Sequence, residues 1–109
     1  MNKLSPTFDS DGYPTEDTLN VIKNWDYKLG FIDLMDYVKE CWEYPECFNK
    51  ENIKNDLGTP IIRYEISTIG WSGNEDIIRS LRENRMFWAC CWVQSRRGGH
   101  YIFEVRINE

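Results

Sequence analysis

Two adjacent glycines, Gly98 and Gly99, constrain what this chain can fold into more than any other feature. They separate two segments, 86–95 and 100–107, that are rich in aromatic and β-branched residues, the residue types that strands favour. Glycine readily adopts the positive φ angles that tight hairpins require, and a glycine pair is typical of a two-residue turn of the primed type. The pattern therefore predicts a β-hairpin in the last quarter of the chain.

The predicted hairpin register decides which side chains share a face, because paired residues point to the same side of a sheet. A two-residue loop pairs Arg97 with His100 and Trp92 with Val105. One face is then apolar enough to be the core: Met86, Trp88, Cys90, Trp92, Tyr101, Phe103, Val105 and Ile107. The other face is half apolar, and we expect two helices, rather than a partner, to cover it, because large exposed apolar patches are uncommon on monomers. It comprises Phe87, Ala89, Cys91, Val93, Ile102, Glu104 and Arg106.

The first half of the chain contains two segments with helical periodicity. After an irregular arm over 1–13, Thr15 is a candidate N-cap for a first helix. In a second helix over 31–43, apolar residues recur at helical spacing until Pro45 ends it. Residues 44–59 show little periodicity and are expected to form a long loop, either a functional segment or an edge excursion held by its own apolar residues.

The second half of the chain predicts a β-α-β-β unit that ends in the hairpin. Residues 61–68 alternate apolar and polar side chains as a strand does. Ser72 and Glu75 then form a capping-box pattern that opens a helix ending near Asn84. The sequence therefore predicts a single α+β domain over 1–109, in which two N-terminal helices precede the unit and helices pack on a three-stranded sheet.

Charge is divided unevenly along the chain. The net charge is −5, and every lysine lies in the first half while every arginine lies in the second. No basic stripe of the kind that binds phosphate backbones is present, which disfavours direct nucleic-acid binding. The acidic first half suits a basic partner protein, such as one that handles nucleic acid, because complementary potentials speed and orient association. The candidate contacts are Asp33, Asp36, Glu40, Glu43 and Glu46, for which a solvated helix face is the competing explanation.

Cysteine usage and hydropathy indicate a protein of a reducing compartment. Cys90 and Cys91 are adjacent and would point to opposite faces of a strand, and no Cys-x-x-Cys pair accompanies the single histidine. We therefore expect free thiols, no metal and no cofactor. No apolar run approaches the roughly 20 residues that span a bilayer, and the N-terminus has no signal-peptide pattern. The expected location is the cytoplasm of the cell that makes the protein.

A second candidate site depends on strand direction. If strands 61–68 and 86–95 run the same way in one sheet, two glycine-containing turns meet at one edge. A helix N-terminus beside two arginines and a histidine favours a small anion such as a nucleotide. The candidate ligand-binding residues are Trp71, Ser72, Gly73, Asn74, Arg96, Arg97 and His100. Each of these residues also has a structural explanation: Ser72 can cap a helix, for example, and the arginines can keep the hairpin tip soluble.

Catalysis at this edge is the third possibility, as a hydrolase or transferase. Ser72 lies in a Gly-Trp-Ser-Gly run, but Asn74 occupies the position at which a nucleophile elbow requires its last glycine. No catalytic residue is therefore assigned, and an enzyme is the less favoured interpretation.

Two runs of residues resemble the pattern of a family of small proteins encoded by bacteriophages and other mobile elements. They are Ser-Thr-Ile-Gly-Trp-Ser-Gly-Asn-Glu at 67–75 and Ser-Arg-Arg-Gly-Gly-His at 95–100. Pro14-Thr15-Glu16, Trp25 and Val38-Lys39-Glu40-Cys41-Trp42 are also similar, so that the resemblance covers most of the chain except residues 44–60. The family is functionally uncharacterised and supplies no established activity. The resemblance implies a phage-type protein that binds and blocks a host protein, such as a component of host defence.

Overall fold

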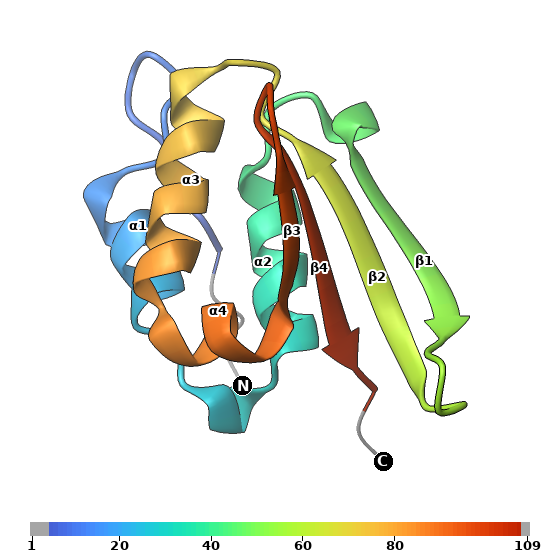
Figure 1. Cartoon of the computed structure of the whole chain (residues 1–109). Coiled ribbons are helices and arrows are strands. Elements are labelled where there is room, and N and C mark those ends of the chain that lie inside the picture. Colours follow the sequence, from blue (N-terminus) through green and yellow to red (C-terminus); the bar gives the residue numbers. More distant parts are fainter. Residues whose placement is uncertain (1–4, 108–109) are drawn as a thin grey trace.

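Four α-helices and four strands make up residues 5–107, the part of the chain that the computed structural model describes (Figure 1). The helices lie against one face of a single sheet, which confirms the α+β class. The helices are α1 (Glu16–Lys23), α2 (Phe31–Cys41), α3 (Ser72–Glu83) and α4 (Arg85–Cys91), with short 3₁₀ turns η1 (Tyr27–Leu29) and η2 (Pro45–Cys47). The strands are β1 (Phe48–Lys54), β2 (Pro60–Ser67), β3 (Trp92–Arg96) and β4 (His100–Arg106).

The sheet has the order β1-β2-β4-β3, and each neighbouring pair is antiparallel. Because β2 and β3 are both antiparallel to β4, they run in the same direction, as the predicted meeting of the two turns requires. They are not neighbours, however, since β4 lies between them (Figure 1). Ser67 at the end of β2 pairs with His100 at the start of β4, and Arg96 at the end of β3 pairs with the same histidine.

The N-terminal helices begin where the sequence indicates. The Thr15 hydroxyl accepts a hydrogen bond from the backbone N–H of Thr18 at 3.3 Å, which caps α1. The arm before it is irregular over its described residues 5–13, apart from one isolated bridge between Phe8 and Pro14, and residues 1–4 lie outside the described part. The expectation of two N-terminal helices is thereby confirmed.

The prediction of a three-stranded sheet is wrong, because residues 44–59 contain the edge strand β1. Phe48 is the buried residue of this strand and pairs with Ile66, while most other β1 side chains are exposed. A strand that buries so little shows no alternation in sequence. The turn after it is tight, since the Asn55 side chain accepts hydrogen bonds from the backbone N–H groups of Leu57 and Thr59, both at 2.9 Å.

The prediction of one strand over 86–95 is also wrong, because residues 85–91 form the helix α4. Phe87 and Cys91 are four residues apart and therefore share one helix face, and both are buried. Met86 and Cys90, which were predicted to belong to the core, are exposed instead. The Asn84 side chain accepts a hydrogen bond from the N–H of Phe87 at 3.1 Å and so caps α4. An unbroken apolar run has no period of its own, and this cap selects the helix.

The hairpin loop contains three residues, Arg97, Gly98 and Gly99, rather than two. Arg96 pairs with His100, so the predicted register is wrong by one residue at the turn. A β-bulge between Trp92 and Gln94 then shifts the register again, which pairs Trp92 with Phe103. Gly98 and Gly99 do adopt positive φ angles, as predicted. The register differs because the loop also contacts another segment: Gly99 accepts a hydrogen bond from the N–H of Thr68 at 3.0 Å.

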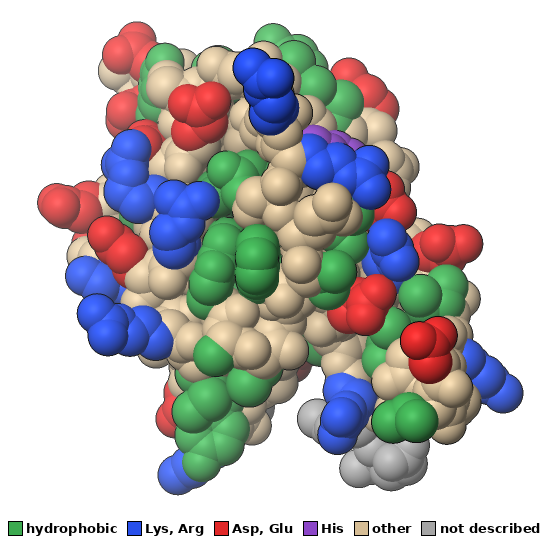
Figure 2. All heavy atoms as spheres, in the orientation of Figure 1, with side chains coloured by type: hydrophobic (Ala, Val, Ile, Leu, Met, Phe, Trp, Pro, Cys, Tyr) green, Lys and Arg blue, Asp and Glu red, His purple; other side chains and the backbone are tan. Residues whose placement is uncertain are grey.

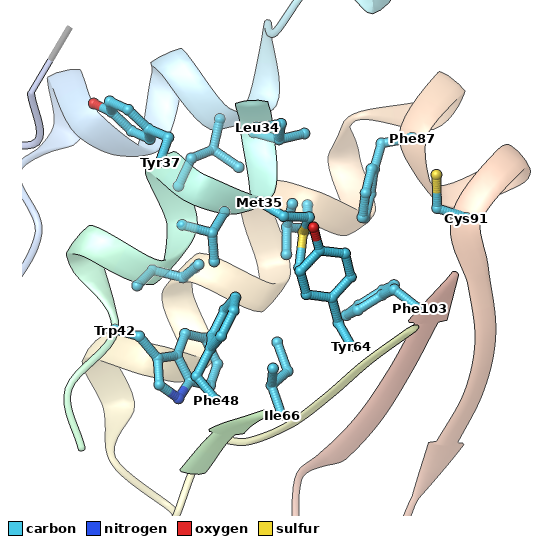
Figure 3. Close-up of a cluster of buried hydrophobic side chains, with 14 of the residues drawn as sticks. Leu34, Met35, Tyr37, Trp42, Phe48, Tyr64, Ile66, Phe87, Cys91 and Phe103 are labelled. Atoms are coloured by element: carbon cyan, nitrogen blue, oxygen red, sulfur yellow. The ribbon is translucent and has the colours of Figure 1, made fainter. Parts of the chain in front are cut away.

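The core lies between the helices and the inner face of the sheet. Figure 3 shows Tyr64 and Phe103 of the sheet lying close to Met35 of α2 and Phe87 of α4. On β4 the predicted core residues Phe103 and Val105 are indeed buried. The core members that are fully buried come from the four helices, β2 and β4: Ile22, Leu34, Met35, Val38, Tyr64, Ile66, Ile77, Leu81, Phe87 and Phe103.

The outer face of the sheet is not covered by helices, in contrast to the expectation. Arg63 lies 3.2 Å from the carboxylate of Glu65 and 3.4 Å from that of Glu104. Ile102 is fully buried on this face and pairs with Glu65. Phe87 and Cys91, which made this face look apolar in sequence, belong to α4 and point into the core. Charged side chains therefore shield the few apolar residues that remain there.

Tyr64 provides a test of the core. Its side chain is fully buried and its hydroxyl group has no hydrogen-bond partner among the described residues. An unsatisfied buried hydroxyl destabilises a protein by about 1–3 kcal/mol. We expect Tyr64→Phe to raise the free energy of unfolding by about 1 kcal/mol in urea denaturation, whereas Tyr44→Phe, at a side chain that is 44% exposed, leaves it unchanged. A loss of stability in Tyr64→Phe would show that the hydroxyl is bonded.

The same residue predicts how stability depends on alkaline pH. Burial raises the pKa of Tyr64 above its ordinary value of 10.0, and Asp36 and Cys91 add to the effect. A group whose pKa is higher in the folded state stabilises the protein below its unfolded pKa, and this stability is lost as the pH rises above it. Wild-type stability should therefore fall above pH 10, and the fall should be smaller in Tyr64→Phe. Equal slopes in the two proteins would contradict this.

Candidate functional site

The two glycine-containing turns meet, as the predicted site requires. The backbone hydrogen bond from Thr68 to Gly99 joins the turn after β2 to the β3–β4 loop. A side chain at Gly99 would collide with the hydroxyl group of Thr68, so the close approach needs glycine there. We call this region, residues 67–74 and 96–100, the turn edge.

Asn74 holds the turn edge together from inside. Its side chain is fully buried, and its amide nitrogen donates to the carbonyl groups of Glu43 at 2.9 Å and Thr68 at 3.4 Å. Its side-chain oxygen accepts a hydrogen bond from the N–H of Glu43 at 3.0 Å. These bonds fasten the segment after α2 to the turn after β2. They leave no amide hydrogen of Asn74 free for a ligand.

Trp71 packs against its own helix and the N-terminal arm. Its ring lies 4.9 Å from that of Tyr13, and a side chain at Gly73 would overlap the indole. The Ser72 hydroxyl donates to the hydroxyl of Tyr13 at 3.1 Å. The predicted capping box is not formed, because α3 begins at Ser72 and its N-cap is Trp71, which makes no side-chain capping bond.

The basic residues of the turn edge lie on the outer face of the sheet. His100 has its Nε2 atom 3.6 Å from the carboxylate of Glu65. Arg96 is exposed and donates to Gln94 at 3.5 Å, and Arg97 is exposed at the hairpin tip. Within the described residues, no hydrogen bond or ring contact joins either arginine to Trp71. The turns are therefore adjacent, but their candidate ligand-binding side chains divide into two groups with separate contacts.

A hollow of about 660 Å³ lies at the other end of β4, and we call it the η1–α4 groove. Cys91 and Val105, each 4% exposed, form its floor. Its rim stands in solvent, with Tyr27 56%, Leu29 59% and Met86 50% exposed. Figure 2 shows hydrophobic side chains gathered at this lower end of the molecule, over η1 and α4. The remaining lining residues are Gly30, Phe31, Ile32, Asp33, Cys90 and Arg106.

The predicted acidic contacts begin at this groove. Asp33, Asp36 and Glu40 lie three and four residues apart on α2, a spacing that places them on one helix face, and all three are exposed. Glu43 and Glu46 follow beyond the helix end and are exposed as well. We call these five residues the acidic row. Asp33 also lines the groove, so the acidic and apolar surfaces are continuous.

The buried thiols are unsuited to nucleophilic chemistry. Burial raises the pKa of Cys41 to about 12, with a smaller contribution from Glu40. Burial also raises the pKa of Cys91 to about 12, with a smaller contribution from Cys90. Thiolate is the reactive form, so both thiols are protonated at neutral pH. All four cysteines are free.

The described residues contain no cluster of three or more potential metal ligands. Among the same residues, no helix has the length and apolar character needed to cross a membrane. Comparison with protein-family models, curated proteins and solved structures finds no match.

Sequence reasoning missed the groove because it placed residues 86–91 in a strand. Met86 and Cys90 were then assigned to the core, and η1 was not predicted at all. One signal was present: Asn84 stands directly before the apolar run, and asparagine is among the preferred N-cap residues. A helix started there places Met86 and Cys90 on one face, four residues apart.

The role of Asn74 can be measured. We expect Asn74→Ala to lower the free energy of unfolding by about 2–3 kcal/mol, because it leaves buried backbone groups without partners. Asn20→Ala, at an exposed position of α1, should change stability little. Urea denaturation of both variants tests this, and equal stabilities would show that Asn74 is not a structural fastener.

Thiol reactivity gives a separate check on α4. Iodoacetamide should modify the exposed Cys90 at neutral pH well before the buried Cys41 and Cys91, as read by peptide mass spectrometry. A strand over 86–95 would instead bury Cys90, and preferential labelling of Cys91 would contradict the helix.

Proposed function

We propose that this protein is a non-catalytic binding protein that engages a basic partner protein through the acidic row. The observation that carries the proposal is the alignment of Asp33, Asp36 and Glu40 on one exposed face of α2. Acidic side chains in one line produce a negative potential along the helix, which steers and orients a positively charged partner. The resemblance to phage-encoded proteins makes a host protein, such as a component of host defence, the expected partner.

Asp36 of the acidic row is only weakly neutralised within the protein. Lys50 of β1 approaches Asp36 at 3.9 Å, and both side chains are about half exposed. Such exposed pairs are worth at most about 1 kcal/mol, so a partner can displace this lysine at small cost. Buried charges held in fixed pairs would argue for a structural role instead.

The competing hypothesis of an anion site at the turn edge has weaker support. Asn74 and Trp71 are engaged in contacts that hold the fold together. His100 faces the carboxylate of Glu65, which repels an anion. A catalytic role has no observation in its favour among the described residues.

Charge reversal tests the proposal. We expect the double variant Asp33→Lys, Asp36→Lys to lose a partner that the wild-type protein captures from nuclease-treated host lysate, by about tenfold or more in quantitative mass spectrometry. The control double variant Glu51→Lys, Asp56→Lys makes the same change in net charge on β1 and its turn, and it should retain the partner. The amount of partner captured by the wild-type protein should also fall as the salt concentration is raised, because salt screens the attraction between charges. Equal capture by both variants would contradict the proposal.

A further inference from the structure

We infer that the η1–α4 groove receives the apolar face of a basic amphipathic helix supplied by the partner. The inference rests on the proposed function and deepens it, since it names the kind of partner segment that the surface fits. It depends on three features of the groove: its exposed apolar rim, its open shape, and the charges on its two walls.

The rim exposes apolar side chains that a monomer would ordinarily bury. Leu29, Tyr27 and Met86 are each at least half exposed, and they surround one hollow rather than lying singly on the surface. Grouped apolar exposure of this kind marks interaction surfaces. The floor is already fixed by buried Cys91 and Val105, so the groove exists before anything binds.

The shape favours a protein segment over a small molecule. Small-molecule sites enclose most of the ligand and direct several polar groups at it. Among the described residues, only two charged side chains, Asp33 and Arg106, line this groove, and its apolar rim is exposed to solvent. A groove between helical elements that offers apolar contacts along its length suits an amphipathic helix, which inserts side chains three and four residues apart.

The charges on the walls indicate which helix fits. On the α2 wall, Asp33 lines the groove and Asp36 continues the acidic row on the same helix face. On the opposite wall, Arg106 at the end of β4 lines the groove. A bound helix therefore gains from lysine or arginine on the flank that faces α2 and loses from them on the flank that faces β4. This asymmetry fixes the orientation of the helix.

The probe is a labelled amphipathic helical peptide of leucine and lysine, and its control has the same composition in an order that scatters the leucines. We expect fluorescence anisotropy with the full chain to show binding of the amphipathic peptide at least about tenfold tighter than of the scattered one. Leu29→Asp and Met86→Asp should each weaken it about tenfold. Leu57→Asp should not, because Leu57 is 89% exposed in the β1–β2 turn and does not line the groove.

A second readout locates the bound peptide without relying on affinity. Cys90 is exposed and lines the groove, whereas Cys47 is partly buried and lies in η2. Saturating peptide should slow the alkylation of Cys90 severalfold and leave that of Cys47 unchanged. Unchanged alkylation of Cys90 under saturation would overturn the inference. Arg106→Glu should tighten binding of the lysine peptide, and weakened binding would overturn the role given to the charges on the groove walls.

The outcomes separate this inference from the proposed function. If Asp33→Lys, Asp36→Lys abolishes binding while Leu29→Asp does not, the acidic row is a binding surface and the groove inference fails. If Leu29→Asp abolishes binding and charge reversal has no effect, the groove binds apolar surface without selecting basic partners. The proposed role of the acidic row and the inferred basic character of the helix then both fail. A concentration-dependent dimer that Leu29→Asp dissolves would assign the groove to a second copy of the chain and overturn the inference.

Discussion

The hydrogen bonds of two buried asparagines hold the ends of α3, and the rest of the structure is arranged around them. Asn74, in the first turn, bonds the backbone of Glu43 beyond α2. Asn84, at the last turn, donates to the carbonyl groups of Ile22 at 3.0 Å and Trp25 at 3.2 Å, at the end of α1. A buried amide is tolerated only when its groups are bonded, so each asparagine permits few arrangements of its neighbours. One end of α3 is thereby fastened to the segment after α2, and the other end is fastened to the end of α1.

The second asparagine also determines where the groove can form. Because the Asn84 oxygen caps the next helix, the chain turns from α3 into α4 without a loop. Phe87 and Cys91 then fill the core, and Met86 and Cys90 are left on the outer side facing η1. The same hydrogen-bonding group therefore completes the core and exposes the apolar rim. Stability and the proposed binding surface are linked at this point.

The surroundings of the two ends of β4 differ: polar groups are hydrogen-bonded at one end, and apolar side chains are exposed at the other. At the turn edge, Thr68, Gly99 and Asn74 form a closed set of hydrogen bonds. At the other end, Leu29 and Met86 leave apolar surface in water, which costs free energy until something covers it. Conspicuous sequence motifs gather at the first end and are explained there by close packing of the backbone. The second end carries no recognisable motif, and its surface is built by residues from η1, α4 and β4.

The sequence by itself determined the elements whose signals are local. Thr15 caps α1, the alternation around Tyr64 predicts β2, and the exposed acidic spacing on α2 follows from helical geometry. The tertiary structure alone decided the others. β1 buries chiefly Phe48 and has no periodicity to read, and the hairpin register depends on a hydrogen bond from the distant Thr68. Residues 86–91 are apolar throughout and have no period of their own. The Asn84 side chain caps a helix there, and its amide is held by backbone carbonyl groups some sixty residues earlier in the chain. Local patterns report which face of an element is buried, whereas pairings between distant residues decide which element forms and what stays exposed.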